Sequence, residues 1–247
     1  MAGSLIWITG ASSGIGAALA RTLPWEGARV IGVSRRVPPV GEHLQLDLTD
    51  VSSWGRLGAS FRKELTGFEG DRVAFIHAAG TLEPIGFAGE VDPQAYQQNV
   101  LLNSAAPQVL GQLFLAAVRD VSADRHVLML TSGAATSVYP GWSSYGAGKA
   151  AIDQWVRDAG AEQDIRGGVT VVAVAPGTVD TGMQARLRDT TEDDFPKRQK
   201  FFDLHQSGQL SDRDQVGRQL WALLDRDLDN GSVLDLRELA ESGGAGP

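Results

Sequence analysis

Residues 4–20 read SLIWITGASSGIGAALA, a short apolar run, a turn with three glycines and a segment with helical apolar spacing. A strand, a glycine turn and a helix start in this order are the context of a dinucleotide-binding site. Gly10 would permit the tight turn, Gly14 would let the backbone approach a pyrophosphate, and Gly16 would let the helix pack against the strand. Amides and the dipole at the helix start favour a diphosphate there. The turn residues predicted to bind a cofactor are Gly10, Ser12, Ser13, Gly14, Ile15 and Gly16.

Strand-like and helix-like segments alternate along the chain. Apolar runs that predict buried parallel strands lie at Leu5–Thr9, Arg29–Val33, Leu44–Leu46, Val73–Ile76, Val127–Leu130, Val169–Ala175 and Val233–Leu236. Longer amphipathic stretches separate them, as in βαβ units joined by right-handed crossovers. We predict a single-domain α/β fold over residues 1–240, a Rossmann-type doubly wound parallel sheet of about seven strands with helices on both faces. The closing residues 241–247 (ESGGAGP) are expected to be disordered.

The composition is that expected of one cytoplasmic domain. The chain has 247 residues and no cysteine, which excludes a disulfide framework and thiolate chemistry. Its four histidines are scattered, so we expect no metal site. No apolar run approaches the ~20 residues that cross a bilayer, so no membrane partner is expected. The net charge of −8 argues against nucleic acid as a partner, because phosphate binding requires a basic face.

A second pattern indicates a catalytic site. Ser132 is separated by twelve residues from Tyr145, which is separated by three residues from Lys149. Tyr145 and Lys149 lie in YGAGKAAIDQWV, which reads as a helix and places both on one face. An ammonium beside a phenol favours the phenolate and lowers a pKa that is about 10 in water. Ser132 ends an apolar run, and its hydroxyl could hold the same substrate oxygen. Tyrosine and lysine at this spacing also occur as plain surface pairs, but here the pattern predicts proton transfer by Tyr145.

Together the two patterns resemble the short-chain dehydrogenase/reductase family over nearly the whole chain. The resemblance implies hydride transfer between a nicotinamide cofactor and a carbonyl–alcohol pair. Ser132 and Tyr145 would polarise the carbonyl, and Tyr145 would donate the proton. Lys149 would hold the ribose hydroxyls and lower the pKa of the tyrosine. Enoyl reductases of this fold usually space tyrosine and lysine more widely, which favours a carbonyl–alcohol couple.

The family resemblance also implies a fourth catalytic residue, an asparagine that positions a water linking the lysine to solvent. Asn103 and Asn99 both lie in the relevant segment, QQNVLLNSAAP. Asn103 is preferred because it lies seven residues after Tyr96, the usual family spacing, and Asn99 is the rival.

Three further landmarks fall in family order. Asp47, in LQLDLTD, matches the acid that usually contacts adenine. His77-Ala78-Ala79-Gly80 stands where the family often has Asn-Asn-Ala-Gly, which puts a side-chain contact by the usual asparagine in doubt. Residues 176–181 match the Pro-Gly turn that holds the nicotinamide carboxamide. The resemblance therefore adds as cofactor-binding residues Asp47, Leu48, Ala78, Ala79, Gly80, Tyr145, Lys149, Pro176, Gly177, Val179 and Thr181.

The end of the second strand predicts which nicotinamide cofactor binds. A carboxylate there would hydrogen-bond the ribose 2′-hydroxyl and repel a 2′-phosphate, whereas an arginine does the reverse. The chain reads VIGVSRRVPP, so Arg35 and Arg36 follow Ser34 and no acid precedes them. Guanidinium groups offer charge-assisted bonds to phosphate. We predict NADP(H), with two solvated loop arginines as the alternative.

The substrate is indicated by the segment 178–210, which should cap the site as a mobile lid. Its sequence is similar to those of sepiapterin reductases and bacterial benzil reductases, and this resemblance implies that the substrate is a vicinal diketone or related ketone. The side chains expected to bind substrate are Ser132, Tyr139, Trp142, Tyr145, Met183 and Leu187, although Trp142 and Met183 could equally be core. Sepiapterin reductases anchor the pterin with an acid near the C-terminus, and Glu238 falls near that position.

Alternative functions remain open from sequence. The enzyme could work oxidatively as an NADP-dependent alcohol dehydrogenase on another substrate class. A non-catalytic NADP-binding regulator is less favoured, because Tyr145 and Lys149 are both present. The helices predicted at Pro93–Val118 and Ser143–Arg166 could act as an interaction scaffold, but are expected to form a homodimer or homotetramer interface, as in most of the family.

Overall fold

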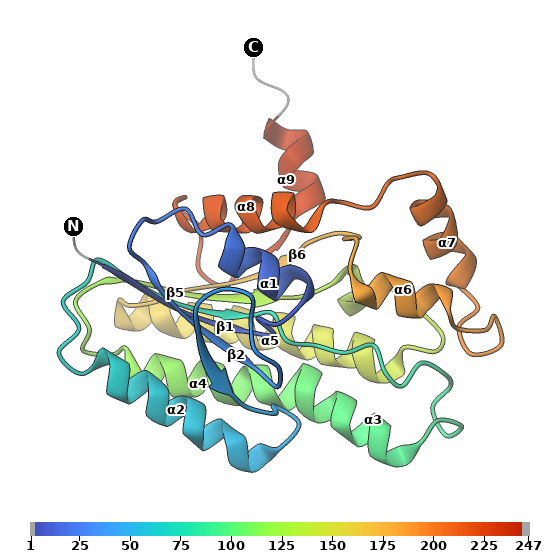
Figure 1. Cartoon of the computed structure of the whole chain (residues 1–247), viewed down its shortest axis with the longest axis horizontal. Helices are drawn as coiled ribbons and strands as arrows, with labels where there is room; N and C mark the ends of the chain where they lie inside the picture. Colours follow the sequence, from blue (N-terminus) through green and yellow to red (C-terminus); the bar gives the residue numbers. More distant parts are fainter. Residues whose placement is uncertain (1–2, 244–247) are drawn as a thin grey trace.

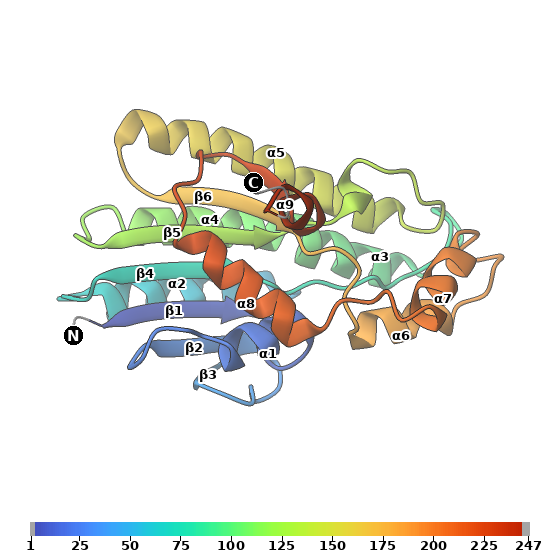
Figure 2. The same cartoon turned by 90° about the horizontal axis from the view of Figure 1, so that it is seen from above.

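One parallel sheet organises the chain. The structure, a computed structural model, describes residues 3–243, with side chains described up to residue 239. The strands are β1 (Ser4–Thr9), β2 (Arg29–Ser34), β3 (Glu42–Gln45), β4 (Arg72–His77), β5 (Asp124–Leu130), β6 (Thr170–Ala175) and β7 (Val233–Asp235). Their order is β3-β2-β1-β4-β5-β6-β7 and every pairing is parallel (Figure 2). The predicted seven-stranded, doubly wound α/β fold is confirmed.

Helices cover both faces of the sheet (Figure 1). One face carries α2 (Val51–Leu65), α4 (Ala106–Ala117) and α5 (Ser143–Arg166); the other carries α1 (Gly14–Arg21), α8 (Arg213–Leu224) and α9 (Leu236–Gly243). Because side chains alternate along a strand, Leu5 and Trp7 enter the first core, and Ile6 and Ile8 enter the second. Burial on both faces explains why the central strands are continuous apolar runs.

The two edge strands differ from the prediction of buried strands. β3 spans Glu42–Gln45 instead of Leu44–Leu46, and its residues are half-buried or exposed. β7 ends at Asp235, because Leu236 begins α9, and its three residues are half-buried. Each edge strand has one neighbour in the sheet, so its sequence does not need to be apolar on both faces.

The predicted helix Pro93–Val118 consists of three parts. α3 (Pro93–Val100) continues through a π-helical turn, Leu101–Ala105, into α4, and Val118 is the C-cap. Pro107 has no N–H to donate to the carbonyl of Asn103 four residues earlier, which favours a wider turn there. The proline in Ser-Ala-Ala-Pro thus shapes the backbone around Asn103.

This helical run also corrects one expectation. Pro93–Ala117 is long and apolar enough, by length and composition alone, to cross a membrane, contrary to the prediction that no segment approaches that size. About a third of its most apolar window is buried. Leu110 and Phe114 belong to the hydrophobic core between this helix and the sheet. A helix that packs on a sheet in this way can also meet the criteria of length and composition used for membrane-spanning helices. The finding therefore carries no argument for a membrane.

The C-terminal third supplies the segment predicted as a lid. It contains α6 (Gly182–Arg188) and α7 (Arg198–Gln206), which lie side by side at one end of the sheet (Figures 1 and 2). Leu187, Phe195 and Phe201 are buried in it, so this polar segment has an apolar underside. At the end of the chain, α9 extends to Gly243, and residues 244–247 of the tail that was expected to be disordered lie outside the described residues.

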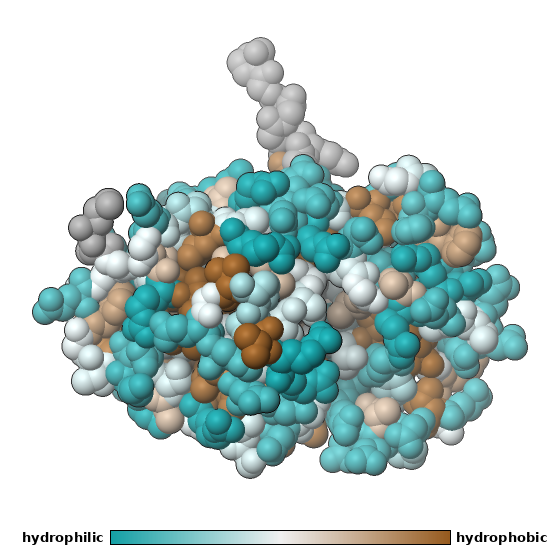
Figure 3. Space-filling view, viewed as in Figure 1, coloured by the Kyte–Doolittle hydropathy of each residue, from teal (hydrophilic) through white to brown (hydrophobic). Residues whose placement is uncertain are grey.

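One face of the molecule shows the polarity of the surface. The face seen in Figure 3 is mostly hydrophilic, with hydrophobic residues in small groups. This distribution is ordinary for a protein surface.

Candidate functional site

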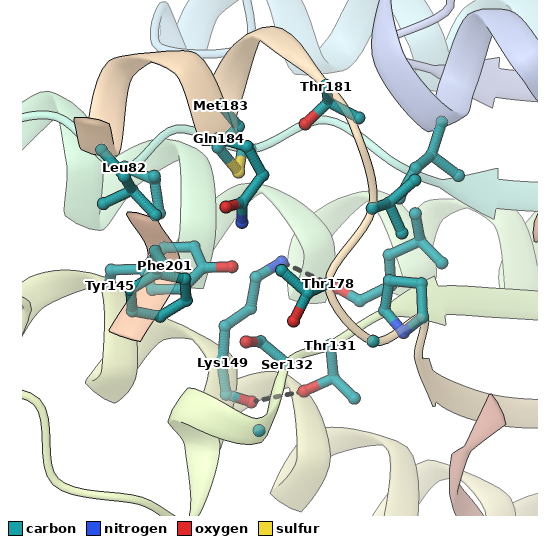
Figure 4. Close-up of a pocket in the computed structure, with 18 of the residues that line it drawn as sticks. Leu82, Thr131, Ser132, Tyr145, Lys149, Thr178, Thr181, Met183, Gln184 and Phe201 are labelled. Atoms are coloured by element: carbon teal, nitrogen blue, oxygen red, sulfur yellow. Dashed lines mark hydrogen bonds between the residues drawn. The ribbon is translucent and has the colours of Figure 1, made fainter. Parts of the chain in front are cut away.

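A cavity of about 160 Å³ opens where the carboxyl ends of β4, β5 and β6 face the lid (Figure 4). The predicted residues that line it are Ile15, Ala78, Gly80, Ser132, Trp142, Tyr145, Lys149, Pro176, Gly177, Val179, Thr181, Met183 and Leu187. The lining residues that sequence reasoning missed are Leu82, Leu130, Thr131, Gly133, Thr178, Gln184, Phe201 and Arg237. We call this space the substrate cavity.

Three polar side chains converge on the substrate cavity from β5 and α5. Ser132 follows β5 and caps the short 3₁₀ helix Gly133–Ala135, accepting a hydrogen bond from the Ala134 amide at 3.2 Å. Tyr145 and Lys149 lie one turn apart near the start of α5, and both are buried. Figure 4 shows Ser132, Tyr145 and Lys149 directed into the same space. The predicted triad is therefore assembled in one place.

Burial controls the electrostatics of this triad. It raises the pKa of Tyr145, and a hydrogen bond with Ser132 opposes that rise. Burial also lowers the pKa of Lys149 to about 8, against the opposing charge of Asp153. The Lys149 ammonium donates to the Leu130 carbonyl at 2.7 Å and lies 5.7 Å from the Tyr145 ring centre. The sequence argument for a lowered tyrosine pKa is thus wrong for this structure, because desolvation outweighs a lysine that is bonded elsewhere.

Both candidate asparagines are buried in one hydrogen-bond network. Asn103, in the π-helical turn, accepts from the Thr81 amide at 3.1 Å and donates to the Thr81 carbonyl at 2.7 Å. It also donates to the Asn99 side chain at 2.9 Å. A Cβ added to Gly80 would lie 3.0 Å from Asn103 Oδ1 and 3.8 Å from Lys149 Nζ, so the amide lies close to the lysine. Asn99 holds the same loop, because it donates to the Glu83 carbonyl at 2.7 Å, whereas Asn103 also packs against Gly148, the residue before Lys149.

A second cavity, of about 250 Å³, lies beside the first and extends to the end of β2. We call it the cofactor cavity. The predicted residues that line it are Gly10, Ser12, Ser13, Arg35, Arg36, Asp47, Leu48, Ala79 and Gly80. Among further lining residues are Ser34, Thr49, Thr81, Asn99 and Leu102. Gly80 borders both cavities, which joins them at one residue.

The glycine turn has the geometry predicted for it. Gly10 has φ +68° and Gly14 has φ +54°, a left-handed conformation that favours glycine. A Cβ on Gly10 would lie 2.9 Å from Ala79 Cα, and one on Gly16 would lie 2.5 Å from the Gly10 carbonyl. The turn thus packs against the loop after β4 and leaves backbone facing the cofactor cavity. Side chains at Gly10 and Gly16 would collide with this backbone, so the tight turn that a dinucleotide site needs requires glycine at both positions, and the residues present fit that group.

Two arginines follow β2 at the far end of the cofactor cavity. Arg35 is exposed, and its Nη1 lies 3.9 Å from Asp47 Oδ2. Asp47 is already engaged, because its other oxygen accepts from the Thr49 amide and hydroxyl at 3.0 and 2.8 Å. Ser34 donates to the Arg36 carbonyl at 2.6 Å, which fixes the turn. This end of the cofactor cavity thus has two arginines, and Ser34 stands where an acid would repel phosphate, so it fits a 2′-phosphate.

His77, the departure from the usual family sequence, is buried at the end of β4. Its Nδ1 lies 3.1 Å from the Thr9 hydroxyl, which accepts from the amides of Ala78 and Ala79 at 3.1 Å each. The hydroxyl therefore donates to Nδ1, and the proton of the neutral imidazole sits on Nε2. Burial and the charge of Lys149 lower the pKa of His77 to about 3. The buried histidine therefore has a structural role. Through the Thr9 hydroxyl it helps to fix the backbone of Ala78 and Ala79, which faces Gly10.

The apolar wall differs from the prediction at one residue. Trp142, Met183 and Leu187 line the substrate cavity as expected, but Tyr139 does not. Tyr139 stacks on Phe195 behind the wall, and its hydroxyl accepts from Lys200 at 2.9 Å. Trp142 serves as both wall and core, because it lines the cavity and packs 4.5 Å from the Phe195 ring.

The acid suggested for pterin binding does not line the substrate cavity. Glu238 is exposed in the first turn of α9, and its neighbour Arg237 lines the cavity instead. The sequence had no signal for this, since a one-residue difference on a short C-terminal helix changes which side chain faces the site.

No cluster of three or more metal-ligating side chains occurs within the described part of the chain. The polar groups on the cavity walls include a phenol, hydroxyls, an amide, an ammonium and a guanidinium, which suit hydrogen bonding and proton transfer.

Comparison with known proteins agrees with this geometry. Residues 4–192 match the family model described as short chain dehydrogenase. A benzil reductase ((S)-benzoin forming) of Bacillus subtilis is 34% identical over 236 residues, covering 94% of this chain and 97% of the relative. Bovine sepiapterin reductase is 30% identical over 168 residues, 66% of this chain and 61% of the relative.

Solved structures agree as well. A short chain dehydrogenase/reductase of Saccharomyces cerevisiae superimposes with a TM-score of 0.81 at 25% identity, covering 94% of this chain and 95% of that chain. The sequence match, the shared fold and the assembled Ser-Tyr-Lys triad lead to one conclusion: the chain belongs to the short-chain dehydrogenase family, as an oxidoreductase that interconverts an alcohol and a carbonyl compound.

Proposed function

We propose that this protein is an NADPH-dependent carbonyl reductase of vicinal diketones or related aromatic ketones. The observation that carries the proposal is the placement of Tyr145 and Ser132 on one wall of a cavity whose other walls include Trp142, Met183 and Leu187. An apolar body and an electron-poor carbonyl suit that combination of surfaces. The similarity to a benzil reductase points to the same substrate class.

The cofactor cavity would hold NADP(H). Gly10, Ser12 and Ser13 would contact the diphosphate, with the start of α1 behind them. Arg35 and Arg36 would contact the 2′-phosphate. When bound, the nicotinamide supplies hydride chemistry, and the protein supplies orientation and electrostatics.

The residues 176–181 border the substrate cavity and connect it to the lid. Pro176, Gly177, Val179 and Thr181 all line that cavity, which is where the carboxamide of a nicotinamide would be held. Asp47 and Leu48 border the cofactor cavity at its other end, consistent with adenine contacts. The expected cofactor contacts therefore run from one cavity into the other.

Proton transfer is assigned to Tyr145. Because burial raises its pKa, the phenol is protonated at neutral pH and can donate to a carbonyl oxygen. Ser132 would hold that oxygen with its hydroxyl. The charge of Lys149 stabilises negative charge as it develops on the phenol oxygen. Asn103 would act through the loop at Gly80 and Thr81 and through its closeness to Lys149.

The relatives bear on the direction of the reaction. The similar protein of Bacillus subtilis is named as a benzil reductase that forms (S)-benzoin. We therefore favour ketone reduction over an oxidative dehydrogenase. A non-catalytic regulator is disfavoured, because Ser132, which has no expected role in binding NADP, is assembled with Tyr145 and Lys149 on the substrate cavity.

Oligomerisation and location complete the proposal. α4 and α5 cover one face of the sheet, and their outer sides expose Val109 and Ile165. We infer a homodimer or homotetramer through these helices, in a cytoplasmic protein. Analytical ultracentrifugation tests the association, and a monomer at micromolar concentration would contradict it.

The activity is tested by NADPH absorbance loss with a ketone panel. We expect turnover of benzil and 1-phenyl-1,2-propanedione, with one carbonyl reduced. The second reduction should be slow, because the product hydroxyl removes the activating carbonyl and places a polar group in an apolar cavity. Sepiapterin is included as a related ketone, and sugars and steroids form the comparison arms. If the protein reduces one of these and none of the vicinal diketones, the substrate class is wrong.

A further inference from the structure

The substrate cavity contains one cationic side chain that the proposed mechanism does not use. Arg237, in the first turn of α9, lines the cavity together with Ser132, Gly133 and Tyr145. Its stem runs past the Pro-Gly turn: a Cβ on Gly177 would lie 3.4 Å from its Cγ and Cδ. A Cβ on Gly133, the residue after the catalytic serine, would lie 3.9 Å from its Nη2. Two glycines thus leave room for this guanidinium beside the triad.

An aspartate holds the guanidinium in place. Asp235, the last residue of β7, accepts from Arg237 Nε at 2.9 Å and from Nη2 at 2.5 Å, and it also accepts from the Arg237 amide. The Asp235 side chain is 16% exposed and that of Arg237 is 63% exposed, so a largely buried carboxylate anchors a guanidinium that also reaches solvent. This two-bond geometry fixes the plane of the guanidinium and removes much of the entropy cost of using it.

The ion pair decides which ligand the arginine suits. A guanidinium has five N–H donors, and two of them point at Asp235, which leaves three, two of them on Nη1. The carboxylate cancels the charge of the guanidinium but does not occupy these donors. An arginine paired in this way offers hydrogen bonds without net charge, so it suits a neutral carbonyl oxygen better than a carboxylate.

We propose that Arg237 is a substrate-specificity residue that donates a hydrogen bond to the second oxygen of a vicinal diketone. The first oxygen lies at Ser132 and Tyr145, and the two oxygens of such a substrate sit on adjacent carbons. Ser132 and Arg237 line the same cavity, and Arg237 Nη2 would lie 3.9 Å from a Cβ on Gly133, the residue after Ser132, which suits a ligand with two adjacent oxygens. The inference rests on the proposed function and deepens it, because it explains a preference for a diketone over a monoketone.

The test compares benzil with deoxybenzoin, which keeps both phenyl rings and replaces one carbonyl by CH₂. Wild type and Arg237→Met are each assayed for kcat/KM with benzil and for the inhibition constant of deoxybenzoin against benzil. The inhibition constant is measurable even if deoxybenzoin is not reduced. We expect Arg237→Met to lower kcat/KM for benzil about 10-fold more than it weakens deoxybenzoin, the effect of one lost hydrogen bond.

A second variant tests the role of the ion pair. Asp235→Asn leaves the guanidinium with net charge, so benzoylformate, whose second group is a carboxylate, should gain about 2- to 5-fold in kcat/KM relative to 1-phenyl-1,2-propanedione. Arg56→Met is the matched control, because Arg56 is exposed on α2, in the layer across the sheet from α9. Thermal melting of each variant separates misfolding from a binding defect.

The outcomes distinguish the two proposals. If wild type reduces no vicinal diketone, the proposed function fails. If wild type reduces benzil but Arg237→Met affects benzil and deoxybenzoin equally, the function stands and the role of Arg237 is overturned. An unchanged benzoylformate ratio in Asp235→Asn would overturn the charge-cancellation argument.

Discussion

His77→Asn should make the protein less sensitive to acid. Wild-type His77 is fully buried, with a pKa of about 3, whereas a histidine in an unfolded chain titrates near 6.5. Below pH 6.5 His77 is therefore protonated in the unfolded chain but stays neutral in the folded protein until the pH approaches 3. The contribution of His77 to stability is complete above about pH 6.5 and is lost as the pH falls toward 3.

The size of the effect follows from the two pKa values. One pKa unit corresponds to about 1.4 kcal/mol, so His77 alone should cost about 3 kcal/mol between pH 7 and pH 4. Asparagine does not titrate, and its side-chain oxygen can still accept from the Thr9 hydroxyl. The variant should thus keep the Thr9 contacts to Ala78 and Ala79 while removing the proton linkage.

Urea unfolding at pH 4, 5, 6 and 7 measures this directly. We expect the fall in unfolding free energy from pH 7 to pH 4 to be about 3 kcal/mol smaller in His77→Asn than in wild type. The comparison is of slopes, so a constant loss of stability in the variant does not affect it. Equal slopes would mean that His77 is protonated in the folded protein, which would refute the buried, neutral histidine.

Three further predictions concern the proposed reaction and its cofactor. Replacing Arg35 and Arg36 by alanine should weaken NADPH roughly 10- to 150-fold and NADH little, measured by cofactor titration; equal losses would refute the 2′-phosphate contact. Tyr145→Phe should lower kcat by at least ~10²-fold with NADPH affinity near wild type, and a variant that keeps a tenth of the activity would exclude Tyr145 as the proton donor. Reduction should decline as the pH rises through about 8, where Lys149 loses its charge, and a flat kcat/KM profile from pH 7 to pH 9.5 would contradict that role.

Sequence was sufficient where a side chain's role depends on local backbone. The glycine turn, the Ser-Tyr-Lys spacing and the central strands each follow from residues close together in the chain. Gly10 and Gly14 have the positive φ angles that the turn requires, and α5 spans the predicted Ser143–Arg166. Local patterns of this kind determine the backbone geometry of the segment in which they occur, so the sequence is enough to predict it.

Sequence was insufficient where the outcome depends on distant packing. Tyr139 was expected on the cavity wall, but Phe195 and Lys200, about sixty residues away in sequence, draw it behind the wall. The pKa of Tyr145 was expected to fall, but the degree of burial is a property of the whole fold. Arg237 was missed because nothing in the sequence shows that the helix after β7 turns that residue toward Ser132.

Gly80 is the residue that lines both cavities. A Cβ added there would lie 3.0 Å from Asn103 Oδ1 and 3.8 Å from Lys149 Nζ. A side chain at this position would therefore press on the amide that holds the loop after β4 and would approach the Lys149 ammonium. Glycine lets the amide and the ammonium stay this close to the loop. Asn103 then has a structural reason to be buried, because it fixes the loop that borders both cavities.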